Sequence, residues 1–128
     1  MKKRIVILGC ISLMTIGVQC HSPKLVGNKT QSEVQNVVSI KEQLAKGAFL
    51  VDVRTKEEFD AGSVKGAVNI PLYDIESRLN DFKGKPYVIL FCRSGHRAGI
   101  AKTMLENHGI TNITNGINAD HINAELTK

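Results

Sequence analysis

The feature that most constrains the fold is a series of short apolar segments separated by helix signals. Residues 86–91 (PYVILF) form the most apolar of them, and residues 48–53 (AFLVDV) are interrupted only by Asp52. Runs of this length that are rich in β-branched residues are typical of strands buried on both faces. Residues 67–71 and 111–114 predict two weaker strands.

Helix signals alternate with these strands. Ser39 with Glu42, and Thr55 with Glu58, form capping-box patterns that predict helices over residues 40–46 and 56–61. Three further helices are expected at residues 75–82, 98–108 and 120–126, the second with Ile100, Met104 and Leu105 turned inward. The alternation predicts an α/β fold: a doubly wound parallel sheet of about five short strands flanked by helices.

The formal net charge of +5 comes from the N-terminal part of the chain. From Thr30 onward, 12 basic residues face 12 acidic ones, because the other five basic residues are Lys2, Lys3, Arg4, Lys24 and Lys29. A basic surface that attracts nucleic acid needs an excess of positive charge on the domain itself. We therefore expect no nucleic-acid partner.

Residues 1–20 predict an export signal, because the basic segment Met1–Arg4 leads into an apolar run, Ile5–Val18. That run is shorter than a membrane span of about 20 residues. The following Cys20 resembles the lipidation site of a bacterial lipoprotein signal, although Gly17 and Gln19 depart from that pattern, and simple secretion stays open. We expect a flexible linker at residues 21–36 and one domain at residues 37–128. The expected location is the bacterial periplasm or cell envelope, with membrane contact only through a lipid on Cys20.

Cysteine usage singles out one thiol. Cys10 and Cys20 lie in the export signal, so Cys92 stands alone in the domain, which cannot rest on a disulfide framework. A lone cysteine is either a reactive thiol or a buried apolar residue. Cys92 directly follows the most apolar strand, at the sheet edge where α/β proteins bind ligands. Asp52 and Arg54 end another strand and are expected at the same edge.

The residues after Cys92 favour the reactive thiol. Gly95 permits a tight turn, in which the backbone N–H groups and the start of the next helix form an anion-binding nest. Such a nest lowers the pKa of a thiol, and Arg93 and Arg97 add permanent positive charge. His96 could act as a second acid or base, but a solvent-facing position is the simpler interpretation. No metal is expected, because one cysteine cannot form the usual zinc sites and the remaining histidines lack ligand spacing: His21, His108 and His121. No other cofactor is expected either, and the sequence has no Gly-rich dinucleotide or Walker-type loop.

Two blocks, residues 50–72 and 87–113, are similar to the single-domain rhodaneses, which are thiosulfate-type sulfurtransferases. The resemblance extends from about Val37 to the C-terminus. It implies that Cys92 takes a sulfane sulfur from a small anionic donor such as thiosulfate, holds it as a persulfide, and passes it to cyanide or a thiol. It also implies an active-site loop of Arg93, Ser94, Gly95, His96 and Arg97, with Asp52 and Arg54 supporting the site. We expect a monomer.

The resemblance has two departures. Ser63 stands where the family often has histidine, a position that we interpret as peripheral to the chemistry, and residues 115–120 (NGINAD) lack the family's double glycine and nearby tryptophan. Two alternatives stay open: a non-catalytic sulfur carrier or protein-binding rhodanese module, and a cysteine phosphatase or arsenate-handling enzyme. The second is disfavoured, because Cys92 and Arg97 have C-x4-R spacing whereas cysteine phosphatases resemble C-x5-R.

Overall fold

The computed structural model describes residues 38–128. The predicted export signal, the linker and Cys20 lie outside the described residues, and the start of the domain at residue 37 stays a prediction. Within residues 38–128, no helix is long and apolar enough to cross a membrane.

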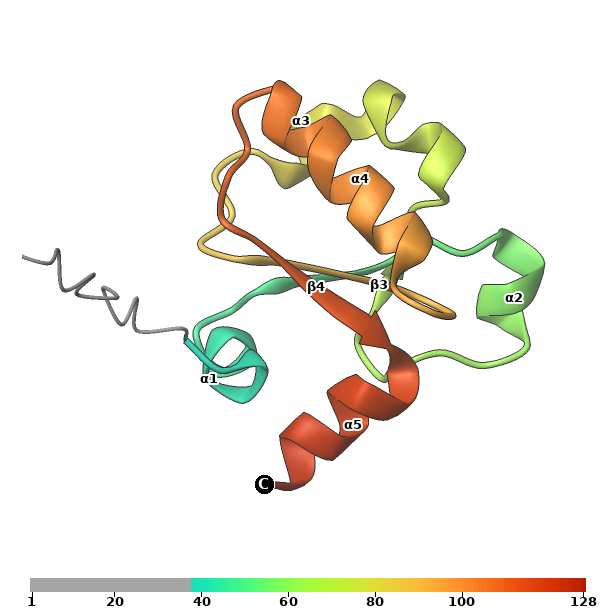
Figure 1. Cartoon of the computed structure of the whole chain (residues 1–128), viewed down its shortest axis with the longest axis vertical. Helices are drawn as coiled ribbons and strands as arrows, with labels where there is room; N and C mark the ends of the chain where they lie inside the picture. Colours follow the sequence, from blue (N-terminus) through green and yellow to red (C-terminus); the bar gives the residue numbers. More distant parts are fainter. Residues whose placement is uncertain (1–37) are drawn as a thin grey trace, which may run out of the picture. The chain divides into compact units, whose positions relative to one another are not determined.

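A four-stranded parallel sheet forms the centre of the domain (Figure 1). Its strands stand in the order β2-β1-β3-β4, and every neighbouring pair is parallel. Their bounds are β1 Phe49–Asp52, β2 Val68–Asn69, β3 Val88–Cys92 and β4 Ile113–Asn118. The fold is α/β as expected, with four strands in the described part of the chain instead of about five.

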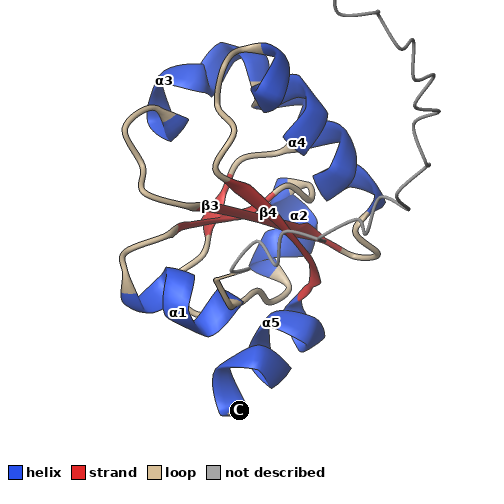
Figure 2. Ribbon diagram, turned by 60° about the vertical axis from the view of Figure 1, so that its left-hand side comes forward, coloured by secondary structure: helices blue, strands red, loops and turns tan. Residues whose placement is uncertain are grey.

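Helices cover both faces of the sheet (Figure 2). On one face lie α1 (Ile40–Ala45) and α5 (Ala119–Thr127), and on the other lie α3 (Leu79–Phe82) and α4 (His96–Asn107). The short helix α2 (Lys56–Asp60) follows β1 at the carboxyl end of the strands (Figure 1). This doubly wound arrangement buries β3 completely.

Alternate residues of β3 belong to two separate core clusters. Val88, Leu90 and Cys92 pack in the cluster that includes residues of α3 and α4. Ile89 and Phe91 pack in the cluster that includes residues of α1 and α5. Burying each large apolar side chain contributes about 1.5–3 kcal/mol to folding. Because side chains alternate between the two faces of a strand, Cys92 lies with Val88 and Leu90 on the α4 side of the sheet.

Of the two predicted capping boxes, the one at Thr55 and Glu58 forms in full, whereas the one at Ser39 forms only in part, because the Glu42 carboxylate accepts from Lys46 instead. The Thr55 hydroxyl accepts from the Glu58 N–H at 3.3 Å, and the Glu58 carboxylate accepts from the Thr55 N–H at 3.2 Å. In α1, the Ser39 hydroxyl accepts from the Glu42 N–H at 3.2 Å. Each bond satisfies a backbone donor that the start of a helix leaves without an intrahelical partner.

Two helix predictions were wrong in detail. Residues 72–82 form two 3-10 turns, η1 (Leu72–Asp74) and η2 (Glu76–Arg78), followed by α3, although Ile75 and Phe82 are buried as expected. Helix α4 begins at His96, two residues earlier than predicted. Its buried face consists of Ala98, Ala101 and Leu105, so Ile100 is 41% exposed instead of turned inward. The face of α4 that packs on the sheet is therefore the one that holds Ala98 and Ala101, and Ile100 lies outside it.

Candidate active site

Cys92 is the last residue of β3, and a three-residue turn joins it to α4. Gly95 closes the turn with φ of +84°, a left-handed conformation that glycine adopts without a steric penalty. The turn brings the Gly95 N–H to 3.1 Å from the Cys92 Sγ, which accepts a hydrogen bond from it. The thiol is therefore held by the backbone of its own loop.

Opposing influences set the ionisation of Cys92. Burial is the largest, and it raises the pKa of the thiol, which is only 3% exposed and packs in the core cluster beside Val53. The backbone N–H groups of Ala98, Ser94, Gly95 and Arg97 act in the other direction, and together they bring the pKa of Cys92 below its ordinary value. Cys92 is thus more enclosed than an atom at the sheet rim, yet the amides of the loop and of the first turn of α4 stabilise its thiolate.

Arg97, in the first turn of α4, is engaged by a carboxylate. Its Nη1 lies 2.6 Å from Oε2 of Glu58, and its Nη2 donates to Oε1 at 2.9 Å. This pairing raises the pKa of Arg97 and lowers the pKa of Glu58 to about 2. The negative charge of Cys92 raises the pKa of Arg97 further, so Arg97 lies close enough to sense both groups. Glu58 therefore offsets part of the positive charge that the sequence predicts around the thiol.

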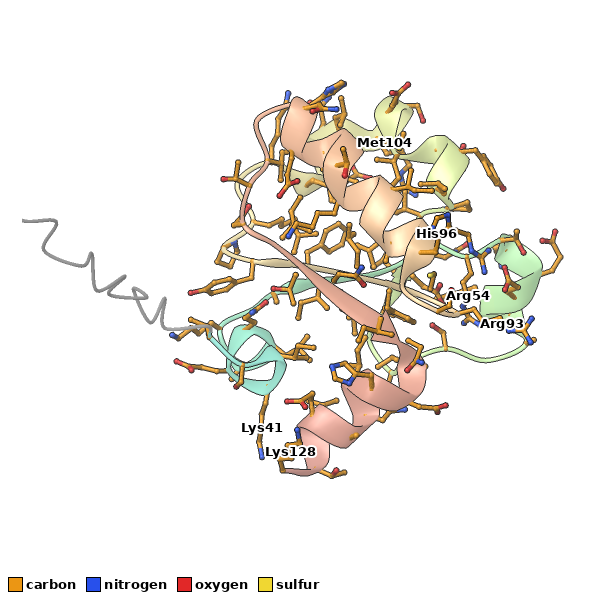
Figure 3. The ribbon with its side chains drawn as sticks, viewed as in Figure 1. Lys41, Arg54, Arg93, His96, Met104 and Lys128 are labelled. Atoms are coloured by element: carbon orange, nitrogen blue, oxygen red, sulfur yellow. The ribbon has the colours of Figure 1, made fainter. Side chains whose placement is uncertain are left out.

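The other loop side chains face solvent. Arg93, Ser94 and His96 are exposed, and Arg93 takes part in none of the ion pairs found within residues 38–128. Arg93, His96 and Arg54 lie at the end of the sheet where α4 begins (Figure 3). An exposed guanidinium at this place can attract an anion to the loop.

Asp52 and Arg54 form a buried network at the end of β1. The Asp52 side chain is fully buried and accepts from the Arg54 Nε at 2.9 Å, the Arg54 Nη2 at 2.6 Å and the Arg54 backbone N–H at 3.0 Å. The Ser63 hydroxyl donates to Asp52 at 2.7 Å, and Arg54 also donates to the Gly62 carbonyl at 2.8 Å. Ser63 is thus part of the network that fixes the strand end, and its place outside the chemistry stays a prediction.

Asn115, in β4, supports the turn at Gly95. The Asn115 side chain donates to the Gly95 carbonyl at 3.0 Å and accepts from the Ile117 N–H at 2.9 Å. Ile117 has φ of 64°, a left-handed conformation that a β-branched residue rarely adopts. It lies in the NGINAD segment, which lacks the family's double glycine. That departure accordingly places a strained residue against the loop.

A pocket of about 450 Å³ opens beside Arg97. Its walls come from the end of β1, from η1 and from α4, with Val53, Pro71, Leu72, Ile100 and Met104 as the apolar lining residues and Thr55, Tyr73 and Arg97 as the others. Met104 lies on the side of α4 that faces the η1 and η2 segment (Figure 3). Ile100, predicted to face the core, is a wall of this pocket.

Sequence reasoning missed three groups that shape the site. Glu58 was interpreted as a capping residue alone, because its partner Arg97 is 39 positions away. Asn115 begins the NGINAD segment, but its contact with Gly95 depends on the pairing of β3 with β4. The pocket was missed because its walls come from three separate elements. The one usable signal was the apolar pair Ile100 and Met104 at helical spacing.

Residues 36–120 match the model of the rhodanese-like domain. Among curated relatives, this chain is 40% identical over 68 residues to the uncharacterized protein YqhL of Bacillus subtilis, covering 53% of this chain and 54% of that protein. It is 33% identical over 72 residues to the thiosulfate sulfurtransferase PspE of Escherichia coli, covering 51% of this chain and 64% of that protein. The matches thus span less than two thirds of either relative.

A solved structure of similar fold is a rhodanese with anions from E. coli. It superposes with a TM-score of 0.54 at 29% identity, covering 58% of this chain and 89% of that one. The match to this fold agrees with the parallel sheet and flanking helices described above.

Proposed function

This chain belongs to the rhodanese-like domain family, and we propose that it is a thiosulfate-type sulfurtransferase that acts through a persulfide on Cys92. The observation that carries the proposal is the loop geometry, in which the Gly95 N–H donates to a Cys92 sulfur whose pKa lies below its ordinary value. Relatives named as sulfurtransferases support transfer of sulfur as the general activity.

The reaction has two displacements. The Cys92 thiolate attacks the outer sulfur of thiosulfate, the S–S bond of the donor breaks, and sulfite leaves with the electron pair. Cyanide or a thiolate then attacks the outer sulfur of the persulfide and forms thiocyanate or a new persulfide. The second step returns Cys92 as a thiolate, which the N–H groups of the loop stabilise as a leaving group.

Other residues of the chain attract the donor and hold the arginines in place. Exposed Arg93 can attract the anionic donor. Glu58 holds Arg97 by two contacts, and Asp52 holds Arg54, so both guanidinium groups are fixed before the donor arrives. No step requires a metal or an organic cofactor, because thiolate, persulfide and leaving group account for every electron pair.

Thiocyanate formation from thiosulfate and cyanide tests the proposal. The full chain with Cys10→Ser and Cys20→Ser leaves Cys92 as its one thiol, and the same chain with Cys92→Ser is the control. Multiple turnovers that disappear in the control are expected. Equal turnover by both proteins rejects the assignment, and a single charge without further turnover supports the sulfur-carrier alternative. Hydrolysis of an aryl phosphate at comparable rates would support the phosphatase alternative.

We further propose export to the bacterial periplasm or cell envelope and a monomeric state. Export rests on the basic residues Lys2–Arg4, the apolar run Ile5–Val18 and Cys20. Fractionation of cells that produce the chain, with Cys20→Ser as a comparison, tests it. Recovery in the cytosolic fraction contradicts export, and a membrane fraction that depends on Cys20 supports lipidation. Light scattering of the purified chain tests the monomer.

A further inference from the structure

The apolar pocket beside Arg97 has no role in the reaction with thiosulfate. Thiosulfate is a small dianion without apolar surface, and the groups suited to it are the loop amides and the exposed Arg93. A pocket of about 450 Å³ is within the size range of small-molecule sites, roughly 300–1,000 Å³. Such a volume exceeds what either thiosulfate or cyanide can fill.

The pocket is adjacent to the reacting sulfur. Arg97 lines it and also senses the charge of Cys92. Val53 lines it as well, belongs to the same core cluster as Cys92, and donates its N–H to the Phe91 carbonyl at 2.9 Å. Because Phe91 immediately precedes Cys92, the wall that Val53 forms lies one strand away from the thiol. Cys92 is not itself a lining residue, but Val53 and Arg97 both lie between the pocket and its loop.

The charge of the pocket selects among substrates. Arg97 is its one charged lining residue, and Glu58 neutralises that charge through two contacts. A dianionic donor gains little binding free energy from such a wall, because the charge of that wall is already neutralised. An apolar group gains binding free energy when it covers Leu72, Ile100 and Met104. Ile100 and Tyr73 are 41% and 73% exposed, so these walls have apolar surface free to be covered.

We propose that this pocket binds the acceptor, a small organic thiol with an aromatic or branched apolar body. The proposal rests on the proposed function and names the substrate of its second step. The apolar body lies against Leu72, Ile100 and Met104, and the thiolate points past Arg97 toward Cys92. It attacks the outer sulfur of the Cys92 persulfide, the Cys92 S–S bond breaks, and the acceptor leaves as a persulfide while Cys92 regains its thiolate.

Burial of Cys92 gives this binding a kinetic consequence. The Cys92 residue is only 3% exposed, so the persulfide that it carries can be approached from few directions. An acceptor whose body is held in the adjacent pocket keeps its thiolate near the persulfide, which turns a rare encounter into a reaction within a complex. We therefore expect the rate of persulfide discharge to saturate with the concentration of an apolar thiol and not with that of a polar thiol.

Single-turnover discharge of the Cys92 persulfide tests the inference. The full chain with Cys10→Ser and Cys20→Ser is charged with thiosulfate and freed of excess donor. It is then mixed with benzyl mercaptan or with 2-mercaptoethanol, and rates are compared per thiolate present. Faster discharge by benzyl mercaptan, with saturation, is the expected result. Ile100→Gln is expected to lower that rate about tenfold, the scale of a lost apolar contact in a pocket, and to leave the 2-mercaptoethanol rate unchanged.

Leu126→Gln is the matched control, because Leu126 is 40% exposed on α5 and is not a lining residue of the pocket. Equal discharge by both thiols, or an equal effect of Ile100→Gln on both, overturns the inference while the persulfide still forms. Failure of the persulfide to form refutes the proposed function instead. The two failures are therefore distinguished by the mass of the charged protein before any thiol is added.

Discussion

Glu58 and Arg97 join α2 to α4 through two parallel contacts, Oε2 to Nη1 at 2.6 Å and Oε1 to Nη2 at 2.9 Å. The same Glu58 carboxylate accepts from the Thr55 N–H and so completes the cap of α2. One side chain therefore fixes a helix start and the arginine beside Cys92. Planar two-point contacts of this kind hold a guanidinium in one orientation.

Replacement of Glu58 by glutamine is expected to weaken this link and to change how stability depends on pH. The folded pKa of Glu58 is about 2, below its ordinary value of 4.5, so the pair stabilises the fold fully above pH 4.5 and loses that effect as the pH falls toward 2. For a partly exposed pair the contribution is about 0.5–1 kcal/mol. Urea unfolding of both proteins at pH 7 and pH 3 measures it. A gap of the same size at both pH values contradicts the ion-pair account.

The pH profile of Cys92 alkylation is expected to have its midpoint below that of an ordinary thiol. Hydrogen bonds from the loop amides favour the thiolate despite burial. Iodoacetamide rates across pH, in the chain with Cys10→Ser and Cys20→Ser, give the midpoint, and the same protein in urea gives the reference. Gly95→Ala is expected to raise the midpoint, because the left-handed φ of +84° is strained for alanine and the Gly95 N–H moves. Identical midpoints for the folded and urea-treated protein contradict the nest.

Substitution of Asp52 by asparagine is expected to destabilise the domain by about 3 kcal/mol, because it leaves the Arg54 guanidinium without a countercharge in a mostly buried site. Ser63→Ala removes one hydrogen bond to the same carboxylate and is expected to cost about 1 kcal/mol. Urea unfolding measures both changes. Equal effects of the two variants would show that the charge pair contributes nothing beyond one hydrogen bond.

Replacement of Ile117 by glycine is expected to stabilise the domain by about 1 kcal/mol. The φ of 64° is costly for a β-branched residue, by about 1–2 kcal/mol, and glycine adopts it freely. Ile117 is 41% exposed, so the partial burial of its side chain that is lost offsets part of this gain. Ile117→Val keeps the branching at Cβ and is the control, expected to give no gain. Destabilisation by glycine together with a neutral valine would show that the Ile117 side chain matters more than its backbone strain.

Local signals predicted the parts of the fold that depend on neighbouring residues. The apolar run at residues 86–91 gave β3, and the Thr55 and Glu58 pattern gave the cap of α2 in full. The segment at residues 72–82 failed, because its apolar spacing fits both a helix and a chain of 3-10 turns, and both bury Ile75 and Phe82. Spacing fixes which side chains face the core better than it fixes the backbone between them.

In the site, too, the features set by neighbouring residues were predicted and those set by packing were not. The Cys92 turn, with glycine at its left-handed position, was readable because the residues are adjacent in sequence. The pairing of Arg97 with Glu58, and the support that Asn115 gives Gly95, depend on how distant elements pack. Ile100 shows the consequence most clearly, because its place on a helix was predicted, whereas its exposure depends on which face of α4 packs on the sheet.

The intact mass of the chain with Cys10→Ser and Cys20→Ser after exposure to thiosulfate, followed by peptide mapping, tests directly whether Cys92 carries a persulfide. A persulfide on Cys92 predicts a gain of one sulfur atom on the peptide that holds Cys92, loss of that gain on addition of cyanide, and no gain in the Cys92→Ser protein. An unchanged mass after thiosulfate, with the fold intact, would contradict it.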